Sequence, residues 1–98
     1  MAIEWLTIEV PEGNRDRFIA LDREIWTKFL SSCPGFIRKQ VWVNPEKPEQ
    51  VCLVVEWESR EEWKAIDPEA LAEVDRSFVA AMGQSYAIVY AGEYMPVG

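Results

Sequence analysis

Apolar and polar residues alternate over the first ten positions of the chain. Leu6, Ile8 and Val10 fall on one side of an extended segment, and polar or aromatic residues separate them. A period of two is typical of a β-strand with one covered face. The sequence therefore predicts a first strand over residues 3–10.

The pattern then changes to a helical period. Between Arg15 and about Ser32, apolar side chains recur every three or four positions, and Pro34-Gly35 follows as a stop signal. These features predict one amphipathic helix that Asn14 caps at its start. Its charged residues are predicted to form a solvated face: Arg15, Asp16, Asp22, Arg23 and Lys28.

Two strand-like runs follow, at residues 36–44 and 51–58. The polar segment between them holds two prolines and predicts a longer hairpin loop. If Asn44 and Gln50 close that loop, Arg38 lies opposite Glu56 on one face of the sheet. Opposite charges across two strands attract, so the sequence predicts an ion pair here.

Helix and strand signals continue to the end of the chain. A capping box, Ser59 to Glu62, opens a short helix directly after the third strand. Asp67-Pro68 opens a longer helix, and Gly83 supplies its left-handed end. The last strand is predicted over residues 86–94, with a bulge at Gly92.

This order of elements, βαββαβ, predicts one α+β domain of ferredoxin-like fold over residues 1–98. Its four-stranded antiparallel sheet carries the helices on one face. The face under the helices is predicted to hold Leu6, Ile8, Val41, Val43, Leu53, Val55, Trp57, Ala87 and Val89. The helix-free face is predicted to hold Trp5, Thr7, Arg38, Gln40, Trp42, Cys52, Val54, Glu56, Tyr86, Ile88 and Tyr90. Its aromatic residues exceed what a monomer usually exposes, so we expect a homodimer through this face.

Composition narrows the function. The chain has 10 basic and 17 acidic residues, a formal net charge of −7, which disfavours nucleic acid and acidic membrane surfaces as partners. No apolar run reaches the length of a spanning helix, and the N-terminus lacks a secretory pattern, so a cytoplasmic protein is expected. Histidine is absent, which excludes Ser-His and Cys-His catalysis and histidine-bound haem. We expect neither a metal nor a cofactor.

Two motifs carry a family resemblance. The turn Cys33-Pro34-Gly35-Phe36 and the strand-to-helix step Glu56-Trp57-Glu58-Ser59, with Trp63 after it, resemble those of antibiotic biosynthesis monooxygenase-like domains. These domains belong to the dimeric α+β barrel superfamily, and the chain is most similar to a branch of small proteins within it. The resemblance implies a homodimer with a cavity between each sheet and its helices or partner.

The resemblance also implies candidate functions and site residues. The Trp and His of the haem-degrading branch would fall near Ile66 and Arg76, so haem degradation is disfavoured. The oxygenase branch implies a cofactor-independent monooxygenase acting on a small aromatic molecule. A non-catalytic dimer that binds a small ligand, or has a purely structural role, is the alternative.

For the oxygenase, Glu56 is the candidate base, and Arg38 or Asn44 would hold the oxyanion. Trp42, Asn44, Tyr86 and Tyr90 are the candidate substrate-binding residues. A structural role remains open for all of them, since ion pairs and aromatic residues also serve packing and interfaces.

Overall fold

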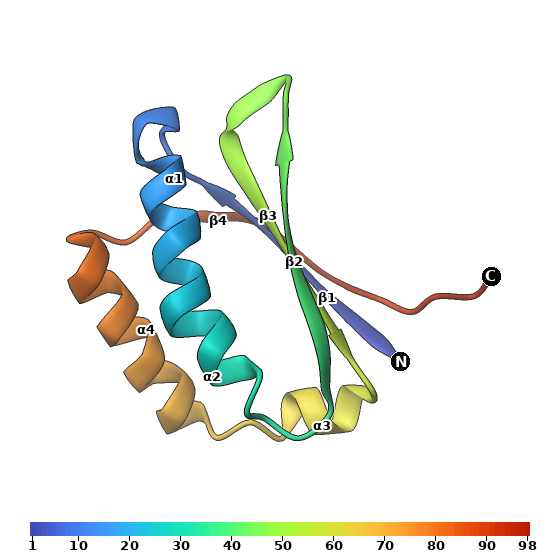
Figure 1. The fold of residues 1–98 in the computed structure, drawn as a ribbon. Helices are drawn as coiled ribbons and strands as arrows, with labels where there is room; N and C mark the ends of the chain where they lie inside the picture. Colours follow the sequence, from blue (N-terminus) through green and yellow to red (C-terminus); the bar gives the residue numbers. More distant parts are fainter.

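The computed structural model describes all residues from 1 to 98 and contains one four-stranded antiparallel sheet in the order β2-β3-β1-β4. The strands are β1 (Ala2–Glu9), β2 (Phe36–Asn44), β3 (Lys47–Trp57) and β4 (Ile88–Tyr94). The helical segments are α1 (Glu12–Leu21), η1 (Asp22–Thr27), α2 (Lys28–Leu30), α3 (Arg60–Lys64) and α4 (Pro68–Met82). The α1-η1-α2 rod and α4 lie on one side of the sheet and α3 lies at its end, and this arrangement confirms the predicted α+β ferredoxin-like fold (Figure 1).

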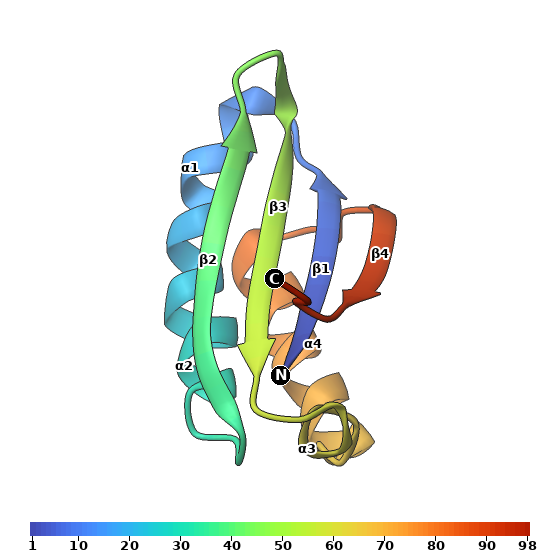
Figure 2. The ribbon, with the colours of Figure 1, turned by 90° about the vertical axis from the view of Figure 1, so that its right-hand side faces the viewer.

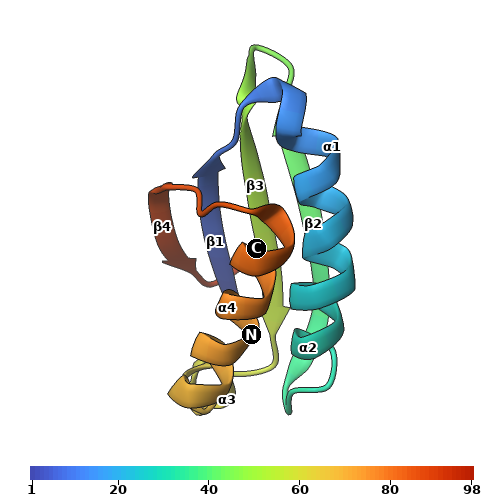
Figure 3. The same ribbon diagram turned by 90° about the vertical axis from the view of Figure 1, so that its left-hand side faces the viewer.

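The two layers are easiest to follow in the side views. From the helix-free side, the four strands lie in front and no helix covers them (Figure 2). From the opposite side, α4 and the continuous α1-η1-α2 rod lie in front of the sheet (Figure 3). No helix is both long and apolar enough to cross a membrane.

The first helix begins earlier than predicted. It starts at Glu12 with Pro11 at its N-cap, and no side chain caps it. Asn14 therefore lies inside the first turn, where its amide Nδ2 donates a hydrogen bond to the Tyr86 hydroxyl at 3.0 Å. The prediction of Asn14 as the cap was wrong because the backbone already turns at Pro11, whose fixed φ suits a helix entry.

The middle of this helix is a π-helix, η1, which the sequence pattern did not predict. Phe18, Asp22, Trp26 and Leu30 all line one side, each four residues after the last. An α-helix turns about 100° per residue, so a spacing of four overshoots a full turn by about 40° each time. A π-helix is wider, with i→i+5 hydrogen bonds, and absorbs this overshoot. The π segment thus keeps the whole row facing the sheet.

The prediction that Asp22 lies on the solvated face of the helix was wrong. Its side chain is 1% exposed, and it pairs with Lys39 of β2. The prediction treated every charged residue of the helix as solvated. Asp22 lies one helical turn after Phe18, on the same buried face, which explains the error.

The β2-β3 hairpin keeps the predicted register but has a shorter turn. Arg38 pairs with Glu56 and Trp42 with Cys52, as predicted. The turn closes at Asn44 and Lys47 rather than at Asn44 and Gln50, because an irregularity next to Asn44 shifts the pairing there. Asn44 Oδ1 accepts a hydrogen bond from the Glu46 amide, which holds this turn.

The last strand differs from its prediction at its start. β4 begins at Ile88, and the bulge lies at Val89 rather than Gly92, because Tyr90 pairs with Thr7 while Ile88 pairs with Ile8. The extra residue in β4 reverses which face of the sheet each side chain before it points to. Accordingly Tyr86 and Ile88 lie on the helix side of the sheet, contrary to prediction. Three residues predicted to be covered by helices are exposed: Ala87 and Val89 near the start of β4, and Val43 at the end of β2.

Capping residues define the remaining helices as predicted. Ser59 Oγ accepts a hydrogen bond from the Glu62 amide at 3.1 Å and starts α3. Asp67 caps α4 through the Glu69 amide, and Gly83 ends it at φ 84°. These contacts confirm the predicted starts of both helices and the end of α4.

Gly35, in the turn before β2, also requires glycine. Its φ is 84°, and a Cβ there would lie 2.8 Å from the Glu62 side chain. The turn therefore packs directly under the start of α3. The Gly35 carbonyl also accepts a hydrogen bond from the Glu58 amide at 2.7 Å.

Buried apolar side chains form two clusters between the sheet and the helices. The larger one joins the upper sheet to α1 and α4: Ile8, Val10, Phe18, Val51, Leu53, Phe78 and Met82. The smaller one lies near α2 and α3: Ala2, Leu30, Val55 and Trp57. Trp26 packs against both clusters, so they are continuous through this side chain.

Candidate active site

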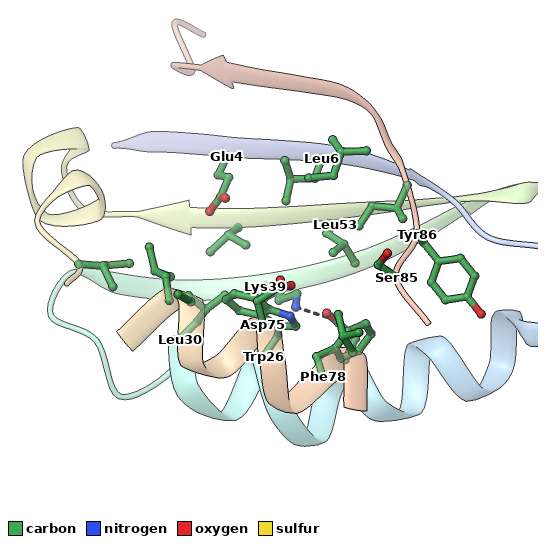
Figure 4. Close-up of a pocket in the computed structure, with 18 of the residues that line it drawn as sticks. Glu4, Leu6, Trp26, Leu30, Lys39, Leu53, Asp75, Phe78, Ser85 and Tyr86 are labelled. Carbon is green, nitrogen blue, oxygen red and sulfur yellow. Dashed lines mark ion pairs between the residues drawn. The ribbon is translucent and has the colours of Figure 1, made fainter. Parts of the chain in front are cut away.

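A cavity of about 790 Å³ lies between the sheet and the helices. Fifteen of its 22 lining residues are hydrophobic. β1, β2 and β3 supply one wall, and η1 and α4 supply the other (Figure 4). Its size and apolar lining are those of a small-molecule pocket.

A buried ion pair forms the most polar part of this lining. Lys39 Nζ lies 2.7 Å from Asp22 Oδ2, and the two side chains are 2% and 1% exposed. Burial raises the pKa of Asp22, and the nearby Lys39 ammonium offsets part of that rise. Both carboxylate oxygens of Asp22 are buried, and apart from the Lys39 contact with Oδ2 neither has a hydrogen-bond partner.

Glu4 is a second carboxyl in the same cavity. It projects from β1 toward the helices (Figure 4), and its Oε1 accepts a hydrogen bond from the Trp57 indole at 3.3 Å. Burial raises the pKa of Glu4 above its ordinary value; the Trp57 hydrogen bond and the charge on Lys39 oppose this rise. A carboxylate with a raised pKa is a stronger base than an ordinary one and can accept a proton from a bound molecule.

The cavity ends at α3, where charged side chains join α3 to β4. Arg60 Nε and Lys64 Nζ lie 2.7 and 2.8 Å from the Glu93 carboxylate. The Arg60 and Lys64 hydrogen bonds lower the pKa of Glu93 to about 2. Lys64 and Trp63 both line the cavity, so this network holds its end wall in place.

Tyr86 is the one predicted substrate-binding residue that lines this cavity. It lies at the end opposite α3, next to Ser85, and packs edge-on against Phe18 with ring centroids 5.7 Å apart. Its hydroxyl accepts the hydrogen bond from Asn14 described above, which orients the ring.

The predicted catalytic pair lies on the other face of the sheet. Arg38 and Glu56 are hydrogen-bonded, as the register predicted, with side chains 62% and 13% exposed. Together with Trp42 they line a shallower hollow of about 440 Å³ on the helix-free face. The ion pair is confirmed, and its catalytic role stays a prediction.

The other predicted binding residues do not join the cavity. Tyr90 lies on the helix-free face and contacts the Tyr94 hydroxyl, while Asn44 holds the hairpin turn. The structure thus brings Arg38, Glu56 and Trp42 together on one surface and separates them from Tyr86.

Sequence reasoning missed the polar part of the cavity lining, in which Glu4, Asp22 and Lys39 carry the charges discussed above. Each had a usable signal. Glu4 and Lys39 alternate in step with the apolar residues of the covered face, Leu6 and Val41, and Asp22 lies four residues after Phe18. A charged residue in step with a buried face indicates a buried functional or paired group.

The side-chain arrangement gives little support to two other kinds of site, a metal site and a cysteine nucleophile. No three His, Cys, Asp or Glu side chains come together as a metal site would require. Burial raises the pKa of Cys33, which disfavours its thiolate.

The sequence matches the model of the antibiotic biosynthesis monooxygenase family over residues 1–67. No curated protein sequence matches the chain.

Solved structures share the fold over nearly the whole chain. A protein from Bordetella bronchiseptica, named after the antibiotic biosynthesis monooxygenases, has a TM-score of 0.76 at 20% identity; the match covers 98% of this chain and 96% of that one. The monooxygenase from the gene ActVA-Orf6 of Streptomyces coelicolor, in complex with nanaomycin D, has a TM-score of 0.76 at 16% identity, with 99% and 88% covered. A variant of SnoaB, a cofactor-independent oxygenase from Streptomyces nogalater, has a TM-score of 0.69 at 14% identity, with 97% and 92% covered.

At these identities the likeness to solved structures concerns the fold. The family match is of a different kind, because it rests on the sequence and spans residues 1–67 of 98. It includes both motifs that carried the resemblance, the Cys33–Phe36 turn and the step from Glu56 to Trp63. The chain therefore belongs to the antibiotic biosynthesis monooxygenase family of the dimeric α+β barrel superfamily.

Proposed function

We propose that the protein is a cofactor-independent oxygenase that acts on a small aromatic molecule held between the sheet and the helices. The observation that carries the proposal is an apolar cavity of about 790 Å³ lined by a half-buried carboxyl, Glu4, whose pKa is raised by desolvation. Two proteins of the same fold support it by their descriptions, one as a cofactor-independent oxygenase and one as a monooxygenase in complex with the ligand nanaomycin D.

The chemistry requires only a base, a binding surface and molecular oxygen. Glu4 removes a proton from an activated CH₂ group of the substrate and leaves a carbanion that the aromatic system stabilises. The carbanion passes one electron to O₂, and the resulting radical and superoxide join to form a carbon–oxygen bond. The peroxide accepts the proton from Glu4, loses water and leaves a ketone. One substrate and one O₂ thus give one ketone and one H₂O.

Glu4 suits the role of base for two reasons. Its raised pKa makes it a stronger base than an ordinary carboxylate. The Trp57 indole, which is fully buried, fixes the position of the carboxylate. A positioned base also removes the entropy of bringing two reactants together.

We further propose that two copies of the chain pack through their helix-free faces. Trp42, Tyr90 and Tyr94 are 45%, 48% and 49% exposed on that face. Trp5 packs edge-on against Trp42, with ring centroids 5.2 Å apart, which makes the aromatic surface continuous. Aromatic side chains of this kind dominate the energetics of stable interfaces.

Oxygen uptake tests the proposed function. Purified protein is mixed with anthrones, which carry an activated CH₂ group, and O₂ consumption is followed above the uncatalysed rate. We expect uptake with at least one substrate and a loss of about 100-fold in Glu4→Gln, because a general base contributes about 10²–10⁴ to a rate. Background uptake with every compound would overturn the proposal.

Glu56→Gln is the matched control, since it makes the same substitution on the helix-free face. We expect it to retain oxygen uptake. If Glu56→Gln loses uptake and Glu4→Gln keeps it, the base is the residue predicted from the sequence. If ligands raise the melting temperature without any uptake, the protein is a binding module.

A further inference from the structure

The ion pair inside the cavity is incomplete. The Lys39 ammonium carries three N–H donors, and its contact with Asp22 Oδ2 uses one of them. Asp22 Oδ1 is buried with no hydrogen-bond partner. A free donor and a free acceptor therefore lie side by side, on side chains that are 2% and 1% exposed.

Such an arrangement is unfavourable unless something completes it. Buried charges are stable only when further hydrogen bonds satisfy their remaining lone pairs and protons. Both side chains line the cavity, so a molecule in the cavity can supply those bonds (Figure 4). Hydrogen bonds to charged groups are also the stronger ones, so the contact would contribute specificity as well as affinity.

The hydrogen-bonding groups of the ion pair determine which groups a bound molecule must carry. Asp22 Oδ1 needs a hydroxyl that donates, and Lys39 needs an oxygen that accepts. Because the two groups lie within one ion pair of 2.7 Å, the hydroxyl and the oxygen must lie on neighbouring atoms of the ligand. A catechol and an ortho-hydroxy ketone both satisfy this geometry.

The rest of the wall indicates a flat apolar body attached to those oxygens. Trp26 of η1 and Phe78 of α4 line the cavity on the helix side, and Leu53 lines it on the sheet side. Aromatic and aliphatic side chains of this kind favour a planar ring system.

We propose that the Asp22–Lys39 pair binds an aromatic ring through two oxygens on neighbouring ring atoms, at least one of which is a hydroxyl. The inference deepens the proposed function and rests on the cavity being the substrate site. It makes Asp22 and Lys39 the residues that determine which position of the ring is presented to Glu4, whose pKa Lys39 also influences.

Two isomers of one compound test the proposal. We would measure binding of 2,3-dihydroxynaphthalene and 2,7-dihydroxynaphthalene by calorimetry under nitrogen, so that no turnover takes place. The isomers have the same size and the same hydroxyl count, and only the first has vicinal oxygens. We expect the vicinal isomer to bind at least about tenfold more tightly, or about 1.4 kcal/mol.

The decisive variant removes the pair without leaving a buried charge. Asp22→Leu combined with Lys39→Met replaces both side chains by apolar ones of similar volume, a change that is often neutral or stabilising for a buried pair. We expect this double variant to fold, by circular dichroism and thermal melting, and to bind both isomers equally. Arg38→Met combined with Glu56→Leu is the matched control on the other face, and it should keep the preference.

Each result decides for or against the proposal. Equal binding of the isomers by the natural chain, no binding of either, or a preserved preference in the double variant would overturn it. Failure of the oxygenase proposal gives a different signature, in which the preference persists under nitrogen and no oxygen is consumed in air.

Discussion

The two faces of the sheet both carry an acid–base pair, and they differ in what surrounds it. Lys39 and Asp22 are almost fully buried under the helices, whereas the Arg38 side chain on the other face is 62% exposed. Arg38 and Lys39 are adjacent in β2, so alternation along one strand places one cation in each environment. The comparison teaches that burial, rather than residue type, separates a candidate site from a surface contact. Only the enclosed face combines charge, an apolar wall and an unsatisfied polar atom.

The largest expected effect comes from breaking the enclosed pair. Lys39→Met leaves Asp22 buried without its partner, and we expect the free energy of unfolding to fall by about 3 kcal/mol. Arg60→Met removes an exposed contact with Glu93 and should lower the free energy of unfolding much less, because solvent screens exposed pairs. Urea denaturation at one fixed protein concentration measures both. Equal losses would contradict the distinction between buried and exposed pairs.

The next effect concerns the helix-free face. Trp42→Ala removes an exposed aromatic side chain that packs against Trp5, and we expect the dimer to weaken by about 2 kcal/mol, or roughly 30-fold in its dissociation constant. Sedimentation over a range of protein concentrations measures the change. Ile37→Ala, also exposed but outside the aromatic surface, is the control. A natural chain that sediments as a monomer at micromolar concentration would remove the dimer altogether.

A smaller effect tests the end wall of the cavity. Ser59→Ala deletes the cap of α3, which carries Trp63 and Lys64 into the cavity lining. We expect a loss of about 1 kcal/mol in the free energy of unfolding. Ligand binding in the cavity should weaken as well, while dimer formation stays unchanged. Weakened dimerisation in this variant would show that the two faces are coupled.

The smallest effect lies in the pH dependence of stability. Burial raises the pKa of Glu4 above 4.5, so the folded protein keeps a proton that the unfolded chain has released. The contribution of Glu4 to the free energy of unfolding is fully present below pH 4.5, and it is lost as the pH rises through the raised pKa. Glu4→Gln should therefore flatten the fall in stability above pH 4.5, as measured by urea denaturation at several pH values.

Exposed Glu93 should act in the opposite direction. Its pKa is lowered from 4.5 to about 2 by Arg60 and Lys64, so its contribution is present above pH 4.5 and is lost toward pH 2. Glu93→Gln is expected to remove this fall in stability between pH 4.5 and pH 2 and to lower the stability above pH 4.5 by a constant amount. A slope above pH 4.5 that flattens as much as it does in Glu4→Gln would contradict the assignment of that slope to Glu4.

Local signals in the sequence were enough to predict the fold. Strand alternation, the cap at Ser59 and the left-handed Gly83 each depend on a few neighbouring residues, and the structure has all of them. The register of Arg38 against Glu56 was also predicted, because a hairpin pairs segments that are close in sequence.

The site was harder to predict because it depends on contacts between distant segments. Asp22 meets Lys39 only when η1 packs on β2, and the helical pattern alone gave Asp22 a place in solvent. The bulge at Val89 moved Tyr86 to the helix side, and no turn residue marks that bulge in the sequence. Predicted residues on the helix-free face were placed correctly wherever the strands ran without a bulge.

The π segment makes the cavity sensitive to chain length. Asp22–Thr27 holds the i→i+5 pattern of a helix with one residue more than an α-helical path needs. Deletion of a single residue within it would restore ordinary α-helical winding and rotate Leu30 by about 100° relative to Phe18. Pocket shape in this chain can therefore change through insertion and deletion at one place, without substitution of any lining residue.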